Sequence, residues 1–227
     1  MTNWLLLHGT PLTPSVWDGV VPLLAGRGQV IAPPVVPGDG PAAGVHRKLA
    51  EQLAADVMDT PTRWHVVGHS FGGQVALELA LQRTELIASL TLLCTRDTPY
   101  PPFATAAAGI LGGTVDIDGA LHRWFSPDEL ADDGPVVRYA RATLATADRR
   151  VWSQALSAIS VFDVSAAVGA IQCPVTVVGA GHDEVSDPSA MAGMAARLPH
   201  SSLTVLEDAW HMSVFTDPVR LAGLMAG

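Results

Sequence analysis

The sequence predicts an α/β fold in which a mainly parallel sheet of about six strands is flanked by helices and carries a small helical insertion. Short apolar, β-rich runs alternate with longer helical patterns along most of the chain. The apolar runs are almost continuously hydrophobic, which is typical of strands buried on both faces of a parallel sheet. Residues 98–165 break this alternation, because they contain helical patterns and no convincing strand.

The predicted elements follow one another in a regular order. Strands are expected at residues 4–7, 29–32, 64–67, 89–94, 174–178 and 203–206. Helical patterns lie at about 45–58, 74–82, 188–197 and 219–225, and the proline-rich stretch 33–41 predicts a loop. We therefore expect a core built from residues 1–97 and 166–227, with residues 98–165 forming a helical cap over one edge of the sheet.

Length and composition fit one domain with an insertion. The chain has 227 residues, of which 48% are hydrophobic and 15% charged, so it can bury a large core. Its formal net charge of -9 argues against a nucleic-acid partner. Cys94 and Cys173 lie at the edges of apolar runs, which predicts buried thiols and not a disulfide or a metal site. We expect neither a signal peptide nor a membrane span at the N-terminus, and hence a cytoplasmic protein.

Residues 68–73, GHSFGG, follow a predicted strand and open a predicted helix. A strand that turns sharply into a helix forces its apex residue into a strained backbone, and neighbours two positions away must then lack side chains. Gly68 and Gly72 satisfy this requirement around Ser70. The turn exposes the serine hydroxyl at a helix N-terminus, where the Phe71 N–H can stabilise an oxyanion. The pattern predicts Ser70 as a nucleophile.

A nucleophilic serine needs a base, and the base needs an orienting acid. In a parallel sheet, only residues just past the carboxyl ends of strands share an edge with Ser70. His211 follows the last predicted strand and is the expected base. The other histidines are placed less well: one lies inside a strand, one on a helix, one before its strand and one in the insertion, and one leaves no later strand for the acid (His65, His46, His200, His122 and His182). The His69 side chain is expected to point away from Ser70.

The acid is expected after the strand at 174–178, where the sequence reads GHDEVSDP. Asp183 comes soonest after the turn and is preferred. Asp187 is better explained as the N-cap of a helix that has Pro188 at its first position. Glu184 and Asp97, the latter just past the strand at 89–94, remain open as alternative acids.

The end of the first strand offers a second donor for an oxyanion. His8, Gly9 and Thr10 end that strand at the same edge, so the Thr10 N–H can face the Phe71 N–H, whereas Pro11 has no N–H. The side chain of His8 is expected to play a structural role in this loop.

Together, HGTPLTPSVWD (8–18), GHSFGG, VVGAGHD (177–183) and the late His211 resemble the α/β-hydrolase superfamily over nearly the whole chain. The resemblance implies Ser70 as nucleophile, His211 as base, Asp183 as acid and the Thr10 and Phe71 amides as the oxyanion hole. The insertion stretches 122–130 and 141–164 resemble the cap of 3-oxoadipate enol-lactonases and related small esterases. Relatives often place the acid four residues before the proline where this chain has five, which keeps Glu184 open.

The expected reaction is hydrolysis of a small-molecule carboxylic ester or lactone through an acyl-enzyme, with no metal or organic cofactor. We expect the insertion to select the substrate, with Trp124, Arg123 and Arg138 as candidate contacts and an arginine available to a substrate carboxylate. No nucleic-acid or membrane partner is expected, and the oligomeric state stays open. The alternatives are a thioesterase, a perhydrolase or a lyase in a biosynthetic pathway, and, from another class, a non-catalytic binding protein.

Overall fold

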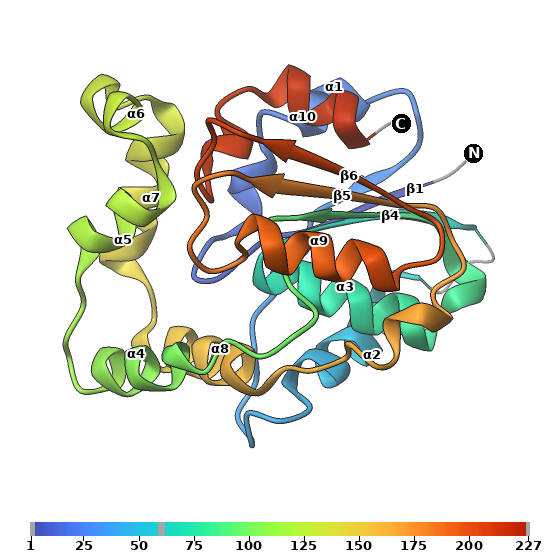
Figure 1. Ribbon diagram of the computed structural model, residues 1–227, viewed down its shortest axis with the longest axis horizontal. Coiled ribbons are helices and arrows are strands. Elements are labelled where there is room, and N and C mark those ends of the chain that lie inside the picture. The colour runs from blue at the N-terminus through green and yellow to red at the C-terminus, as the bar shows by residue number, and fades with distance from the viewer. Residues whose placement is uncertain (1–2, 59–61, 226–227) are drawn as a thin grey trace.

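A computed structural model describes residues 3–58 and 62–225 of the chain. Its centre is a six-stranded sheet with the order β2-β1-β3-β4-β5-β6, in which every neighbouring pair is parallel (Figure 1). The strands are β1 (Asn3–Leu7), β2 (Val30–Ile31), β3 (Trp64–His69), β4 (Ile87–Leu93), β5 (Val175–Ala180) and β6 (Ser201–Leu206). All six predicted strands are confirmed. Residues 1–2, 59–61 and 226–227 of the expected core segments lie outside the described residues.

Helices cover both faces of the sheet. α1 (Val21–Leu24) and α10 (Pro218–Met225) lie on one face, and α2 (Val45–Val57), α3 (Phe71–Gln82) and α9 (Pro188–Arg197) lie on the other (Figure 1). α3 begins three residues earlier than predicted, because the chain turns from strand to helix at the single residue Ser70. Short 3-10 helices complete the connections, at Pro14–Trp17, Thr84–Leu86, Val168–Ala170 and Ser213–Phe215.

The strand order places the carboxyl ends of β1 and β3 at a switch point. From β1 the chain moves outward to β2 on one side and then crosses back to β3 on the other side of β1. The connections on either side of such a point leave the sheet in opposite directions, which opens a crevice beyond the strand ends. His8, Gly9 and Thr10 follow β1 and Ser70 follows β3, so both segments border this crevice.

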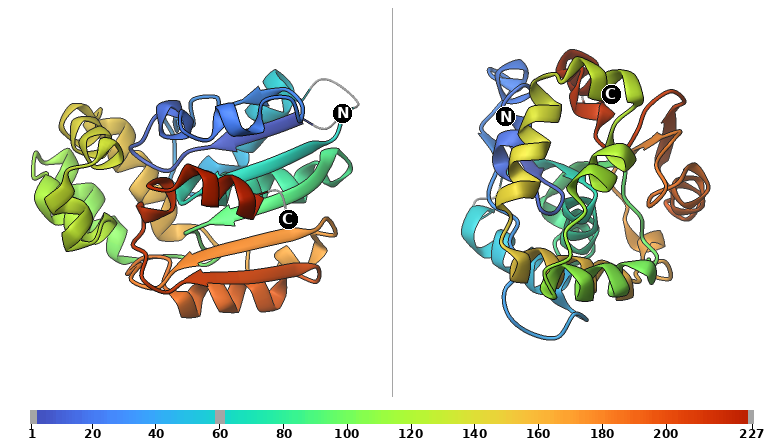
Figure 2. Two further views of the ribbon diagram at one scale, coloured as in Figure 1. Left: turned by 90° about the horizontal axis from the view of Figure 1, so that it is seen from above. Right: turned by 90° about the vertical axis from the view of Figure 1, so that its left-hand side faces the viewer.

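The stretch 98–165 contains the remaining helices and, as predicted, no strand. They are α4 (Pro102–Leu111), α5 (Ile117–Trp124), α6 (Pro127–Asp132), α7 (Pro135–Thr146) and α8 (Arg149–Val161). The strand arrows point toward these five helices, which lie beyond the carboxyl ends of the sheet (Figures 1 and 2). The loop 33–41 has neither helix nor strand, as predicted. Among the described residues, no helix combines the length and the apolar character needed to cross a membrane.

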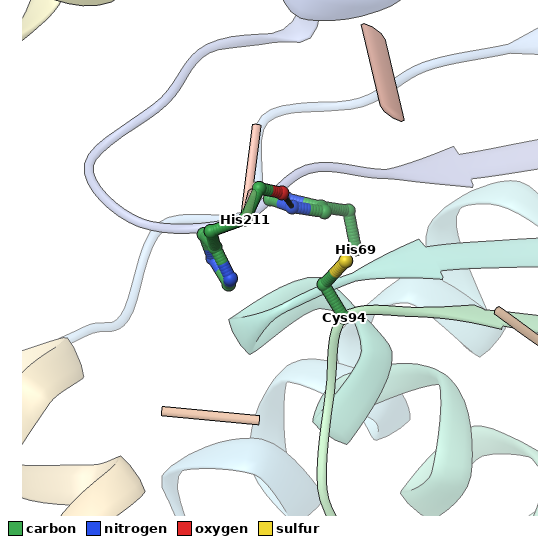
Figure 3. A group of neighbouring side chains, drawn as sticks. All are labelled: His69, Cys94 and His211. Carbon is green, nitrogen blue, oxygen red and sulfur yellow. Dashed lines mark hydrogen bonds between the residues drawn. The ribbon is translucent and has the colours of Figure 1, made fainter. Parts of the chain in front are cut away.

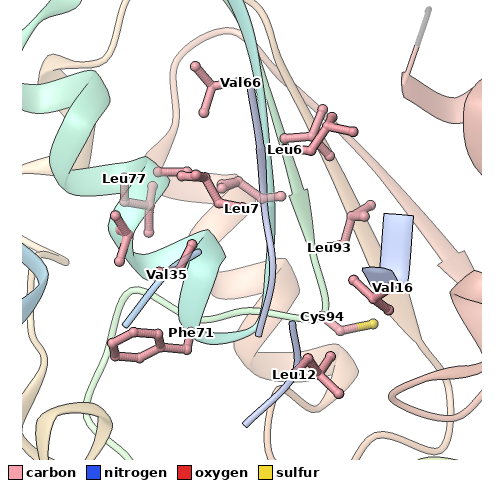
Figure 4. Close-up of a cluster of buried hydrophobic side chains, with 14 of the residues drawn as sticks. Leu6, Leu7, Leu12, Val16, Val35, Val66, Phe71, Leu77, Leu93 and Cys94 are labelled. Carbon is pink, nitrogen blue, oxygen red and sulfur yellow. The ribbon is translucent and has the colours of Figure 1, made fainter. Parts of the chain in front are cut away.

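The core is built around the central strands. Leu5, Leu6 and Leu7 are fully buried, because helices cover both faces of β1. Leu7, Val35 and Phe71 gather on one side of β1, close to the start of α3 (Figure 4). Burying a leucine or phenylalanine side chain stabilises a fold by roughly 1.5–3 kcal/mol. The turn that carries Ser70 is therefore packed against buried apolar side chains.

Candidate active site

Ser70 occupies the strained position that the sequence predicts. Its backbone has φ 52° and ψ -120°, in a region that residues with side chains rarely adopt. Hydrogen bonds hold the residue on both sides: its N–H donates to the Leu93 carbonyl at 2.9 Å, and its carbonyl accepts from the Thr95 hydroxyl at 2.7 Å. These contacts to β4 and to the residues after it offset the local strain and keep Ser70 at the apex of the turn.

The glycines around Ser70 are required by close backbone contacts. A Cβ at Gly68 would lie 2.6 Å from the Cα of Gly73, and a Cβ at Gly73 would lie 2.6 Å from the Cβ of Thr95. A Cβ at Gly72 would collide with the Leu7 backbone of β1. The spacing in the sequence thus reflects the close approach of α3 to two strands.

His211 and Asp183 meet at the same edge of the sheet. Nδ1 of His211 lies 2.6 Å from Oδ2 of Asp183, and both side chains are buried. Oδ1 of Asp183 accepts the N–H groups of Val185 and Ser186 at 2.9 and 3.0 Å. Burial opposes ionisation of this carboxyl, but His211 and the two backbone donors outweigh it and hold the pKa of Asp183 below its usual value. An ionised Asp183 requires Nδ1–H on a neutral imidazole, which leaves Nε2 free to accept a proton.

The alternative acids are placed differently. Asp97 is fully buried, but its carboxylate receives two hydrogen bonds from Arg197, at 2.9 and 2.7 Å, and none from His211. It connects the segment after β4 to α9. Glu184 is exposed and lines the same cavity as His211, whereas the imidazole bonds its neighbour Asp183. Asp187 caps α9 as expected, accepting from Ser189 and Ala190.

Ser70, Asp183 and His211 all line one cavity of about 390 Å³ beneath the helices 102–161. The Ser70 hydroxyl makes no hydrogen bond to the imidazole among the described residues. Such bonds are often long before substrate binds and tighten in the complex. The structure thus brings three residues from distant parts of the sequence to one rim of the sheet.

The loop after β1 reaches the same place. A Cβ at Gly9 would lie 3.0 Å from the Cβ of Ser70, and Thr10 lines the cavity with Ser70. Neither the Thr10 N–H nor the Phe71 N–H donates a hydrogen bond within the described residues, so both are available to a ligand.

His8 anchors this loop. Its Nε2 accepts the Val35 N–H at 2.9 Å, so Nδ1 carries the proton and donates to the Gly9 carbonyl at 2.8 Å. Burial lowers the pKa of His8 to about 4, and the imidazole stays neutral near pH 7. The side chain is structural, as expected.

His69 has a role that the sequence analysis does not assign to it. Its ring centroid lies 4.8 Å from that of His211, and Nε2 donates to the His211 carbonyl at 3.1 Å (Figure 3). Burial, with the neighbouring His211, lowers the pKa of His69 well below its usual value, so this histidine is a neutral donor. Arg96 was likewise missed as a support, since its guanidinium donates to the Val185 carbonyl at 2.6 Å, beside Asp183. Both roles depend on the hydrogen-bond partner, the His211 carbonyl for His69 and the Val185 carbonyl for Arg96, and these partners lie far away along the sequence.

His69, Cys94 and His211 are the group within the described ranges that has metal-ligand geometry, with ligand atoms within 4.8 Å of one another (Figure 3). The donor set does not favour a metal. Burial raises the pKa of the Cys94 thiol well above its usual value, so the thiol stays protonated, and metals bind the thiolate. Nδ1 of His211 and Nε2 of His69 are already hydrogen-bonded.

The candidate substrate contacts divide in two. Arg123 and Trp124 line the cavity, and the Trp124 ring lies 6.4 Å from that of His211. Arg138 is absent from the cavity lining; it is exposed, and its guanidinium donates to the Asp133 carbonyl. Of the two arginines, Arg123 alone keeps a place in the expected site.

The sequence model of the alpha/beta hydrolase family matches residues 4–224 of this chain. "Putative carbamate hydrolase RutD" of Pseudomonas syringae pv. syringae (strain B728a) is 30% identical over 204 residues, which cover 86% of this chain and 76% of that protein. The pimeloyl-acyl-carrier-protein methyl ester esterase of Aromatoleum aromaticum is 26% identical over 240 residues, covering 97% and 95%.

Among solved structures, the enol-lactonase of Burkholderia xenovorans LB400 superposes with a TM-score of 0.90. The match covers 99% of this chain and 90% of that one, at 20% sequence identity. This likeness shows a common fold.

Proposed function

Because the chain belongs to the alpha/beta hydrolase family, we propose that it hydrolyses a small carboxylic ester or lactone through an acyl-enzyme formed on Ser70. The observation that carries the proposal is the 2.6 Å contact between His211 Nδ1 and Asp183, in the cavity that also holds Ser70. This contact orients the imidazole and selects the tautomer with a free Nε2, which is what a general base beside a serine needs.

In the first half of the reaction, Nε2 of His211 takes the proton of the Ser70 hydroxyl as its oxygen attacks the substrate carbonyl. Asp183 stabilises the imidazolium that forms. The imidazolium then gives its proton to the leaving alcohol, the bond from carbonyl carbon to leaving oxygen breaks, and the acyl group stays on Ser70. Water repeats the sequence with the same histidine and releases the acid. The steps use no metal or organic cofactor.

The negative charge that develops on the carbonyl oxygen is assigned to the Thr10 and Phe71 N–H groups. The Phe71 N–H also lies at the N-terminus of α3, where the helix dipole favours a negative charge. In serine hydrolases, one such donor contributes about 10²–10³-fold to kcat. The approach of Gly9 to Ser70 supports this assignment, because it brings the two loops within reach of a single oxygen.

The cavity suits an acyl group with an apolar chain. Much of its lining is hydrophobic, from α4 and α8: Phe103, Ile110, Trp152, Leu156 and Ile159. The acidic lining residues Asp116 and Glu184 disfavour an anionic substrate in the same space. Of the described lining residues, Arg123 alone carries a positive charge. An acidic substrate would therefore place its carboxylate at Arg123.

We also assign the segment 98–165 the role of a cap that selects substrates over a core of residues 1–97 and 166–227. Helices α4, α5 and α8 support this division, since they supply most of the cavity lining that is not strand-end residues. A cytoplasmic location remains part of the proposal and is supported by Cys94 and Cys173, which are both free and buried.

Covalent labelling tests the proposal directly. A fluorophosphonate is expected to modify Ser70, identified by mass spectrometry, while Ser70→Ala removes both the label and activity on p-nitrophenyl esters of graded chain length. By analogy with other catalytic serines, the loss is on the order of 10⁴-fold or more. Ser189→Ala, an exposed serine on α9, is the matched control and should label normally. Hydrolysis by Ser70→Ala near the wild-type rate would refute the assignment.

An acidic substrate has a separate test. If Arg123 binds a substrate carboxylate, Arg123→Ala should lower kcat/KM for acidic esters by about 10-fold or more and leave neutral esters nearly unchanged. Equal losses on both kinds of ester would exclude carboxylate recognition at this residue.

A further inference from the structure

The loop that carries His211 is hydrogen-bonded at both residues that flank this histidine, and one of these bonds reaches the cap directly. The Met212 N–H donates to the Trp124 carbonyl at the end of α5, at 2.9 Å. On the other side, the Trp210 N–H donates to the Ser213 hydroxyl at 3.0 Å. The carbonyl of His211 itself accepts from His69. The backbone of residues 210–212 is thus fixed at each residue.

The Ser213 hydroxyl leads to one carboxylate on α6. Having accepted the Trp210 N–H, it donates its own proton to Oε2 of Glu129 at 2.8 Å. The same oxygen accepts the Ser126 N–H at 2.8 Å. Oε1 lies 3.2 Å from the Thr216 hydroxyl, whose single proton has a nearer acceptor in the Ser213 carbonyl at 2.8 Å. Glu129, on α6 of the cap, is half-buried against the 3-10 turn Ser213–Phe215 that follows His211. Its carboxylate accepts hydrogen bonds from both Ser126 and Ser213.

We propose that Glu129 is a positioning residue for His211: through Ser213 it holds the 210–212 loop so that the imidazole keeps its alignment with Asp183 and Ser70. The inference rests on the proposed function, in which His211 is the base. A carboxylate suits this role because each oxygen can accept two hydrogen bonds without giving one back. Misplacing a catalytic group by about 1 Å can cost on the order of 10²-fold in rate.

Glu129 also belongs to a capping box, which a test has to separate from the proposed role. The Ser126 hydroxyl accepts the Glu129 N–H at 3.1 Å and caps α6, and Glu129 returns a bond to the Ser126 N–H. Replacing either side chain by alanine weakens the helix start by about 1 kcal/mol. Only the Glu129 replacement removes the connection to Ser213. Ser126→Ala is therefore the matched structural control.

The experiment compares Glu129→Ala, Glu129→Gln, Ser126→Ala and Ser213→Ala with the wild-type protein. Glu129→Ala is expected to lower kcat for a p-nitrophenyl ester, and the rate constant of Ser70 phosphonylation, by about 10- to 100-fold, with KM changed by less than about threefold. Glu129→Gln should recover most of the loss, because its amide oxygen still accepts from Ser213. Ser126→Ala should stay within about threefold of wild type.

A second measurement does not depend on turnover. An imidazole N–H strongly bonded to a carboxylate gives a far-downfield proton NMR signal, so the His211 Nδ1–H signal should broaden or move upfield in Glu129→Ala and persist in Ser126→Ala and Glu129→Gln. The double variant Glu129→Ala/Ser213→Ala should lose no more than the larger single loss, because both changes break one connection.

The inference is wrong if Glu129→Ala labels at the wild-type rate with its downfield signal intact, or if Ser126→Ala loses as much activity as Glu129→Ala. Failure of the proposed function looks different. In that case the wild-type protein itself fails to label at Ser70, whatever the state of Glu129.

Discussion

The serine turn and helix α4 of the cap line one cavity, and Gly68 and Gly73 at the turn are far more crowded than Gly109 on α4. At Gly68 and Gly73, an added Cβ would lie 2.6 Å from backbone or side-chain atoms. At Gly109 on α4 the nearest atom would be 3.9 Å away, and at Gly134, before α7, nothing lies within 4 Å. The rigid side, which carries Ser70, is built by backbone segments in close approach, whereas α4 has room at Gly109. On α5, a Cβ at Gly119 would collide with the Asp116 side chain, which can move, and the atoms nearest to it are not backbone.

This difference separates two tasks of the site. Under the proposed function, a nucleophile, a base and an oxyanion hole need fixed positions. Close-packed backbone suits that need because it cannot relax by rotamer changes. A substrate pocket can change shape through its side chains with little effect on the rest of the fold. The contacts of Glu129 with Ser213 and of Trp124 with Met212 differ from such pocket residues, since they join the cap to the rigid side.

The largest expected effect belongs to the rigid side. Asp183→Asn should lower kcat/KM by about 10⁴-fold, because an amide can direct its N–H₂ at His211 and so favour the wrong imidazole tautomer. Ester hydrolysis and Ser70 labelling measure the loss. Glu184→Gln is the companion variant. A large loss there, with activity preserved in Asp183→Asn, would move the acid role to Glu184.

Acid should weaken the rigid side next. The pKa of His8 is lowered to about 4, so between pH 6.5 and about 4 the unfolded chain binds a proton that the folded chain does not. The free energy of unfolding should therefore fall across this window by about 3 kcal/mol from His8 alone. Burial lowers the pKa of His46 to about 3 and adds a loss of the same sign.

Urea unfolding at several pH values measures this loss. His8→Gln keeps an acceptor for the Val35 N–H and does not titrate, so its stability should depend less on pH than that of the wild type. An identical pH dependence in the two proteins would contradict the burial argument.

A matched pair of glycine variants tests the contrast itself. Gly68→Ala should destabilise the protein by on the order of 3 kcal/mol, since its Cβ meets backbone that cannot move aside. Gly109→Ala should be neutral or stabilising by up to about 1 kcal/mol, because alanine favours a helix and the site has room. Thermal and urea unfolding report both values. Equal destabilisation by the two changes would show that the serine turn and α4 are equally tightly packed at these glycines.

The smallest effect is expected in the cap. Ala106→Leu extends a cavity-lining side chain of α4, and it should lower kcat/KM for long-chain p-nitrophenyl esters by about 10-fold relative to the acetate ester. Ala108→Leu makes the same change two residues along α4, at an exposed position outside the cavity lining. It should leave chain-length preference unchanged. If the two variants behave alike, α4 does not limit the acyl chain.

Much of the fold was accessible from the sequence because its signals are local. Continuous apolar runs mark the buried strands, and proline content marks the loop 33–41. Helix α1, only Val21–Leu24, was missed because four residues are too few for a periodic pattern. The start of α3 was misplaced because glycines are poor helix formers, and only the close approach to Leu7 and Thr95 explains why they are there.

The sequence by itself determined the order of strands and helices, and it singled out Ser70, whose constraints come from residues at most a few positions away. It also restricted the base to the ends of strands. The tertiary structure alone decided that His211 bonds Asp183, that Asp97 bonds Arg197, that His69 bonds the His211 carbonyl and that Glu129 bonds Ser213. These pairings join residues far apart in the chain, and hydrogen bonds depend on distances in space that spacing along the sequence does not encode.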